Sequence, residues 1–185
     1  QSTGPFSQRI GHTSDMGVSF TILGRGRVGR ALAEAWGPRV ALVSHEANPE
    51  GLVLLAVPDE ALPECAGRFA GRCVHMSGSW HLEGVPSAHP LTSFNGRARD
   101  WSGTPLALTG EVPEVLRRAF VDLGFVPFSL SPEHKALYHA CAVLVSGHAA
   151  TLWLGAERML AEAGIALPGR GLKPLMEATL RNVIQ

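Results

Sequence analysis

Three glycines near the start of the chain have a spacing that is typical of phosphate binding. Gly24, Gly26 and Gly29 form a G-x-G-x-x-G triplet. The first glycine of such a triplet allows a tight turn, the second lets the backbone approach a pyrophosphate, and the third lets a helix pack closely on a strand. The pyrophosphate would bind the free N–H groups at the positive end of the helix dipole. We therefore expect a dinucleotide to contact the loop formed by Gly24, Arg25, Gly26, Arg27, Val28 and Gly29.

The sequence on either side of the glycines has the context that this site requires. Residues 18–23 are a short, β-rich apolar run, and Val28, Ala31, Leu32 and Ala35 follow the glycines with helical spacing. A strand, a glycine turn and a helix in that order distinguish a dinucleotide fingerprint from a chance match. The alternative is a glycine turn that serves only packing.

The end of the second predicted strand, residues 39–43, bears on the choice of cofactor. Enzymes that use NAD usually carry an acidic residue there, which binds the ribose 2′-hydroxyl. This chain has Ser44 and His45, and Glu46 follows one or two positions too late. Ser44 can donate to a 2′-phosphate and Arg25 can supply a cation, so the sequence favours NADP over NAD. The alternative is that the arginines of the glycine loop are solvated charges. Binding of S-adenosylmethionine would also usually need the missing acid.

Further strands and helices are predicted to build a sheet beyond this point. We expect strands at residues 52–57, 73–77, 85–88, 105–108 and 125–128, and helices at 59–69, capped by Asp59, and at 113–123. Ligands of such sheets bind beyond the carboxyl ends of the strands. This rule adds Val57, Pro58, Ser77 and Ser79 to the predicted cofactor cleft.

One histidine follows a predicted strand end and could exchange a proton there. His89 comes directly after residues 85–88, and Ser77 ends a neighbouring strand. An imidazole with a pKa near 6.5 can accept a hydroxyl proton as hydride leaves, or donate one in reduction. We expect His89 and Ser77 to be catalytic. The alternative is that His89 only holds its loop by bonding to backbone.

A long helix is predicted after the sheet. Ser131, Pro132 and Glu133 form a helix start, and nothing but two glycines interrupts the pattern until Gly164. Lys135, His139 and Ser146 lie at helical spacing on one face, while His148 points roughly the opposite way. We expect that polar face, with His139 as a catalytic candidate, to close the far side of the pocket. Ordinary interior polar groups are the alternative.

A second helix is predicted at residues 173–183. Two helices cannot form a full core alone, so they must pack on the sheet domain or on a second subunit. We favour a homodimer that forms through these helices.

Composition excludes several classes of protein. Lys plus Arg and Asp plus Glu are equal at 16 each, so no overall field attracts nucleic acid or an anionic membrane. The three cysteines are scattered without a C-x-x-C pair, which argues against a disulfide framework or a metal site. No apolar run approaches the roughly 20 residues of a membrane span. We therefore expect a soluble cytoplasmic protein.

Six segments together resemble one family. They are LGRGRVGRALA, LVLLAVPDEAL, VHMSGS, SAHPLTSF, LYHACAVLVSGHAATL and PLMEATLRNV. From residue 18 to 183 the chain resembles the uncharacterised Rossmann-like oxidoreductases with a helical C-terminal domain of unknown function. Relatives of that family include pyrroline-5-carboxylate reductases, deazaflavin-dependent NADP reductases and prephenate dehydrogenases. The resemblance implies an NAD(P)-binding domain followed by an α-helical dimerisation domain.

The resemblance also bears on single residues. His89-Pro90-Leu91 resembles the His-Pro-Met segment of prephenate dehydrogenases, whose histidine bonds the substrate hydroxyl. The family usually reads Ser-Asn-His where this chain has Ser146-Gly147-His148, so an amide that could contact nicotinamide or substrate is missing. The family also continues with further helices beyond residue 183. We expect either a truncated chain or a pocket that is completed differently.

These observations predict an α/β protein with a Rossmann-like, doubly wound, mainly parallel sheet, followed by a small all-α domain with one long helix. The expected parts are a leader at residues 1–17, a dinucleotide-binding domain at 18–130 and a helical domain at 131–185. The predicted function is NADP-dependent hydride transfer to or from a small carbonyl, imine or hydroxyl substrate. The alternative is a non-catalytic nucleotide-binding or sensing module that dimerises through its C-terminal helices.

Overall fold

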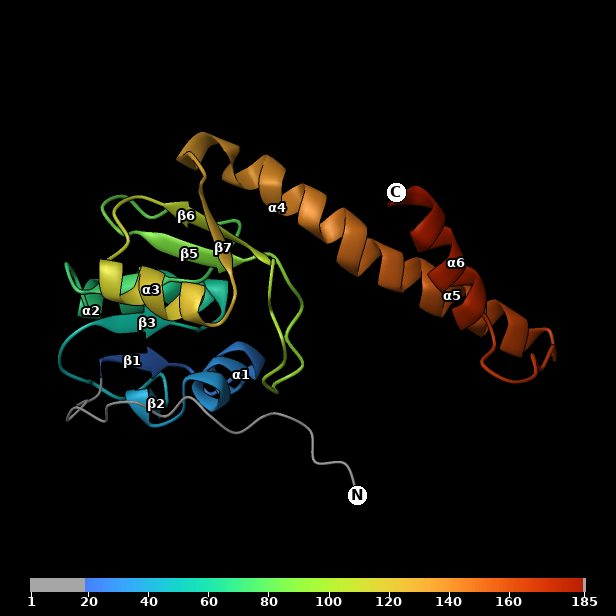
Figure 1. Ribbon diagram of the computed structural model, residues 1–185, viewed down its shortest axis with the longest axis horizontal. Coiled ribbons are helices and arrows are strands. Elements are labelled where there is room, and N and C mark those ends of the chain that lie inside the picture. The colour runs from blue at the N-terminus through green and yellow to red at the C-terminus, as the bar shows by residue number, and fades with distance from the viewer. Residues whose placement is uncertain (1–18, 185) are drawn as a thin grey trace, which may run out of the picture. The chain divides into compact units, whose positions relative to one another are not determined.

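The computed structural model describes residues 19–184, so the expected leader at residues 1–17 lies outside the described residues. The chain forms two compact units, which divide between His139 and Ala140 (Figure 1). The first unit contains the sheet and the second contains helices only. The predicted domain boundary after residue 130 stays a prediction.

The first unit is built on a seven-stranded sheet with the order β2-β1-β3-β4-β5-β6-β7. Its strands are β1 (Phe20–Leu23), β2 (Val40–Val43), β3 (Val53–Leu55), β4 (Cys73–His75), β5 (Ser87–Pro90), β6 (Pro105–Thr109) and β7 (Val126–Ser129). All neighbouring strands are parallel except β5 and β6. The predicted Rossmann-like, mainly parallel sheet is therefore confirmed. The strand order reverses between β1 and β3, which makes their carboxyl ends the crevice of the sheet.

Helices cover the sheet of the first unit and continue into the second. They are α1 (Arg27–Trp36), α2 (Leu62–Arg68), α3 (Glu114–Asp122), α4 (Lys135–Val143), α5 (Ala149–Glu162) and α6 (Lys173–Val183). One apolar layer joins the sheet to α1 and α3, where Trp36 packs edge-on against Phe20 and Phe120 at ring distances of 5.1 Å. The other layer joins Leu55 and its neighbours to Phe69 beyond α2. Both faces are buried, which explains why the central strands are almost wholly apolar.

The contact between β4 and β5 is the weakest in the sheet. These strands pair at a single position, His75 with Ser87. Every other pair of neighbouring strands has three or four paired positions. The sheet therefore has a narrow junction between its parallel part and the part that holds β5, β6 and β7.

Two local predictions are wrong. The strand predicted at residues 85–88 is β5 at Ser87–Pro90, because Val85 forms a bridge with Leu82 and His89 pairs with Ala107 of β6. His89 therefore lies within a strand rather than after it. Asp59 does not cap a helix with its side chain. It begins a 3₁₀ turn before α2, and its carboxylate accepts a hydrogen bond from Ser79.

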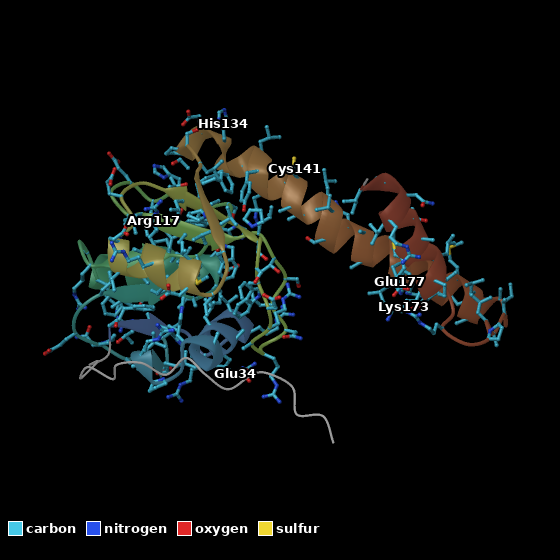
Figure 2. The ribbon with its side chains drawn as sticks, in the orientation of Figure 1. Glu34, Arg117, His134, Cys141, Lys173 and Glu177 are labelled. Carbon is cyan, nitrogen blue, oxygen red and sulfur yellow. The ribbon has the colours of Figure 1, made fainter. Side chains whose placement is uncertain are left out.

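The second unit has no core of its own. No residue between 140 and 184 is buried. A π-helical turn at Leu144–His148 joins α4 to α5, and Gly164 ends α5 with a φ of +71°, as the sequence predicts. Helix α6 begins and ends at the predicted residues. Figure 2 shows Lys173 and Glu177 on this helix, where they form an ion pair of 3.7 Å.

The helical run Pro132–Glu162 differs from the sequence-based expectation about membranes. It has 31 residues and is, by length and composition alone, apolar enough to cross a membrane. The expectation that no apolar run approaches this length is therefore wrong, because the few polar residues inside the run do not lower its apolar character enough. The same length and composition suit a helix whose apolar face packs against another protein surface.

Candidate active site

The glycine loop has the shape that its sequence predicts. Gly24 has a φ of +119°, and a Cβ atom there would lie 2.3 Å from the carbonyl oxygen of Ala56. A Cβ on Gly29 would lie 1.9 Å from the carbonyl oxygen of Gly24. Gly26 has open space, with nothing within 4 Å of a Cβ at that position. The first and third glycines are therefore required by packing, whereas the second leaves room for a ligand.

The start of α1 supplies hydrogen-bond donors to the same space. The first helical hydrogen bond runs from the N–H of Arg30 to the carbonyl of Gly26. The N–H groups of the residues before Arg30, including Arg27 and Val28, precede this bond and have no carbonyl partner within the helix. The loop and the helix start together fit a pyrophosphate.

The Glu46 carboxylate lies close to the end of β2, although the sequence places Glu46 one or two positions too late. The hydroxyl of Ser44 donates to Oε2 of Glu46 at 3.2 Å, and His45 Nε2 lies 3.8 Å from Oε1 of the same carboxylate. Arg68 of α2 holds the segment by donating to the carbonyls of His45 and Ala47 at 2.8 and 2.7 Å. Counting along the sequence places Glu46 too late, but its side chain turns back to Ser44.

The turn after β4 is tied to the 3₁₀ turn that precedes α2. Ser79 Oγ donates to Asp59 Oδ2 at 2.9 Å, and Ser77 Oγ accepts the N–H of Trp80 at 3.0 Å. The hydroxyls of Ser77 and Ser79 lie 3.3 Å apart. Asp59 follows Val57 and Pro58, so the carboxyl ends of β3 and β4 are joined by side chains.

His89 has a phenol rather than backbone as its partner. Its Nδ1 lies 3.0 Å from the hydroxyl of Tyr138, and the two rings meet edge-on. The His139 ring lies 6.1 Å from the His89 ring. Burial, with the charges of His139 and Lys135 as smaller causes, lowers the pKa of His89 to about 4. His89 is therefore neutral near pH 7.

Gly78 determines how closely the two histidines approach the turn. A Cβ atom on Gly78 would lie 2.8 Å from His139 Nδ1 and 2.8 Å from His89 Nε2. His139 Nδ1 is buried, and it has no hydrogen-bond partner among residues 19–184. Any larger residue than glycine would displace one or both imidazoles.

Lys135 lies behind this turn rather than on the wall of a cleft. Its side chain is 2% exposed, and its Nζ donates to the carbonyl of Ser77 at 3.1 Å and to Ser87 Oγ at 2.7 Å. Burial lowers the pKa of Lys135 to about 8, although Asp59 opposes the shift. Lys135 thus bridges β4 and β5 at their single point of pairing.

His75, below the same turn, is a buried structural residue. Its Nδ1 accepts the N–H of Ser77 at 3.3 Å. Burial, reinforced by Lys135, lowers the pKa of His75 to about 4, so it stays neutral.

A cavity of about 220 Å³ joins the glycine loop to His89. Its lining consists of Arg27, Val28, Met76, His89, Pro90, Thr92, Ser93 and Phe94. The loop after β5 is held to α1 by Glu34, which accepts the N–H of Ala98 at 3.0 Å (Figure 2). Larger cavities of about 360 and 430 Å³ contain none of the predicted site residues.

Sequence reasoning missed Tyr138 and Gly78 as site residues, and it named Asp59 only as a helix cap. The prediction that Ser146 closes the pocket stays a prediction. Tyr138 is the only tyrosine in the chain and follows Lys135 by three residues, which is a helical neighbour's spacing. That spacing could have identified it. Ser146 belongs to the second unit, where its hydroxyl donates to the carbonyl of Ala142 at 2.6 Å.

Comparison with known proteins supports the sequence resemblance. Residues 104–185 match the family model described as "Domain of unknown function (DUF2520)". The predicted resemblance is confirmed. The DUF2520 match includes Lys135, Tyr138 and His139, whereas the glycine loop and His89 precede it. Among curated proteins, none matches this chain.

Solved structures share the fold at low sequence identity. A Bacteroides fragilis protein provisionally named an NADP oxidoreductase is 20% identical, with a TM-score of 0.74 over 93% of this chain and 82% of its own. Prephenate dehydrogenase from Aquifex aeolicus is 13% identical, with a TM-score of 0.58 over 89% and 78% of the two chains. An imine reductase from Myxococcus stipitatus in complex with NADP⁺ is 15% identical, with a TM-score of 0.55 over 88% and 74%. These likenesses establish the fold.

Proposed function

We propose that this protein is an NAD(P)-dependent oxidoreductase that transfers hydride between a nicotinamide cofactor and a small carbonyl, imine or hydroxyl substrate. The cavity that is lined by Arg27, Val28 and His89 carries the proposal. A dinucleotide bound by the glycine loop would direct its nicotinamide toward this cavity. The names of the similar structures, an NADP oxidoreductase and an imine reductase with NADP⁺, support the same reading.

Each residue of the site has a role in this proposal. The N–H groups around Gly26 bind the pyrophosphate, and Ser44 and His45 contact the adenosine ribose. Val57, Pro58 and Ser77 line the cleft at the carboxyl ends of β3 and β4. The bound cofactor supplies the hydride, and His89 exchanges a proton with the substrate oxygen or nitrogen. His139 is the second catalytic candidate on this side, with its ring 6.1 Å from that of His89.

Calorimetric titration of the purified chain with NADPH, NADH and S-adenosylmethionine tests the proposal. We expect binding of a nicotinamide dinucleotide and none of S-adenosylmethionine. Consumption of NADPH with a panel of small carbonyl and imine compounds then separates an oxidoreductase from a nucleotide-binding module. Binding without turnover on any compound would favour the module.

Cofactor preference gives a pair of opposite predictions. We propose that Ser44 and Arg25 favour the 2′-phosphate of NADP, while the Glu46 carboxylate beside Ser44 opposes it. Glu46→Gln should therefore raise the affinity for NADPH relative to NADH, and Ser44→Asp should lower it, each by roughly tenfold for about 1.4 kcal/mol. Calorimetry with both cofactors measures the ratio. A native protein that binds NADH as tightly as NADPH would contradict the preference.

We also propose a soluble, cytoplasmic homodimer that forms through residues 140–184. Leu152, Met159 and Val183 are 76%, 71% and 76% exposed, so apolar surface of α5 and α6 is left uncovered. Each such side chain gains about 1.5–3 kcal/mol when it is fully buried, and a second copy can cover several at once.

Light scattering after size-exclusion chromatography measures the association. We expect a dimer for the native chain, a monomer for Leu152→Asp, and a dimer for the control Val121→Asp on α3 of the first unit. A monomeric native chain, or one that sediments with lipid vesicles, would overturn this arrangement.

A further inference from the structure

The hydrogen bond between His89 and Tyr138 indicates which ring nitrogen of His89 carries the proton. A neutral imidazole has one protonated nitrogen, and its neighbours determine which one. The hydroxyl of Tyr138 lies 3.0 Å from His89 Nδ1, and this is the one hydrogen bond of that hydroxyl in the part of the chain that the structure describes. Either the phenol donates to Nδ1, or Nδ1–H donates to the phenol oxygen.

The first arrangement satisfies both groups. Tyr138 has a single proton, and a half-buried hydroxyl whose proton lacks an acceptor is unfavourable. If Nδ1–H donated, the phenol proton would have no acceptor among residues 19–184. Burial raises the pKa of Tyr138 to about 12, so the phenol keeps its proton. Because burial also lowers the pKa of His89 to about 4, the imidazole does not become doubly protonated near neutral pH.

We infer that Tyr138 donates to Nδ1 of His89 and thereby fixes His89 in the tautomer that carries its proton on Nε2. Tyr138 is then a positioning residue, and His89 presents an N–H donor to the cavity. The consequence for catalysis rests on the proposed function, whereas the tautomer itself does not.

The surroundings of Nε2 fit a role in ligand binding. No residue between 19 and 184 forms a hydrogen bond with this nitrogen, and His89 lines the cavity beside the glycine loop. Gly78 lies against this edge of the ring and has no side chain to cover it. The Nε2–H group is therefore free to donate to an oxygen or nitrogen atom of a substrate.

An Nε2–H donor favours reduction of a C=O or C=N bond. The substrate carbon receives the hydride that the reduced nicotinamide supplies, and the π electrons move to the oxygen or nitrogen. That atom takes the proton from Nε2, and the Tyr138 proton moves to Nδ1. After the product leaves, water protonates Nε2 and Nδ1 returns its proton to Tyr138, so the starting tautomer is restored and hydroxide passes to the solvent. The substrate is reduced and the nicotinamide is oxidised, so the deduced substrates are carbonyl or imine compounds rather than alcohols.

Long-range ¹H–¹⁵N correlation spectra of the full chain report the tautomer directly. Without any dinucleotide and near neutral pH, we expect the His89 ring to have a protonated Nε2 and an unprotonated Nδ1. Loss of signals in His89→Gln assigns the ring. Tyr138→Phe should shift the Nδ1 resonance, because the hydrogen bond is lost while the aromatic ring remains.

Phe128→Leu provides the matched control. Phe128 packs on the Tyr138 ring at 6.1 Å, so this change alters packing but leaves the hydroxyl in place, and the Nδ1 resonance should stay where it is. A native His89 with its proton on Nδ1, or an Nδ1 resonance unaffected by Tyr138→Phe, would overturn the inference. If Tyr138→Phe does not fold, the native spectrum alone decides. A protein with the expected tautomer that binds no dinucleotide would refute the proposed function and leave the tautomer standing.

Discussion

The Gly26→Val variant should fold normally and lose its affinity for NADPH and NADH. The backbone of Gly26 has a φ of −70°, which valine can adopt, and nothing lies within 4 Å of a Cβ at this position. The new side chain would instead occupy the space in which the pyrophosphate approaches the backbone. We expect affinity to fall by at least about 100-fold. Calorimetry measures the affinity, and circular dichroism with thermal unfolding checks the fold.

Gly67→Val is the matched control. Gly67 lies in α2, and a Cβ there would also meet nothing within 4 Å. This variant likewise adds a valine side chain where a Cβ meets open space, but it has no contact with the glycine loop. It should bind NADPH as the native chain does. Unchanged NADPH affinity in Gly26→Val would mean that the dinucleotide site lies elsewhere.

The His89→Ala variant should bind the cofactor normally and turn over slowly. His89 lines the same cavity as Arg27 and Val28, and its Nδ1 bonds to Tyr138 rather than to backbone. Its removal therefore takes away a proton donor without loosening the loop that holds the pyrophosphate. Loss of a general acid–base group typically lowers the rate by about 10²–10⁴. Steady-state kinetics and NADPH titration of the same preparation separate the two effects.

His81→Ala is the control for this change. His81 is exposed and lines a different cavity, so its loss should leave turnover unchanged. Equal loss of activity in both variants would indicate a general effect on the protein. If His89→Ala turned over as fast as the native protein, His89 would have no part in the chemistry.

Local sequence signals predict much of this fold. The apolar run before Gly24, the glycine triplet and the periodic helix after it lie within about one strand and one helix, so their meaning does not depend on distant residues. The same holds for α6, whose predicted bounds agree with the structure. The first and last residues of β5 could not be predicted from local sequence. They depend on pairing with β6, which lies further along the chain.

The arrangement of the site depends on contacts between distant residues. Lys135 and Ser77 are 58 positions apart, and His89 and Tyr138 are 49 apart. Helical spacing predicts that Lys135 and His139 are neighbours on one helix face. It does not predict which distant residues they contact. The π-helical turn at Leu144–His148 also changes the angular spacing along the long helix, so the predicted alignment of Ser146 with Lys135 assumes a regularity that the helix lacks.

The narrow junction between β4 and β5 has a mechanical consequence. Ser77 follows β4 and His89 lies in β5. The distance between them therefore depends on the strand pair that has only one paired position. Lys135 spans that point with one bond to the Ser77 carbonyl and one to Ser87. The separation between Ser77 and His89 is therefore maintained by an ammonium group that is not part of the lining of the cavity beside His89. Lys135 thus cross-links two parts of the sheet that share a single paired position, and the relative placement of Ser77 and His89 depends on this cross-link.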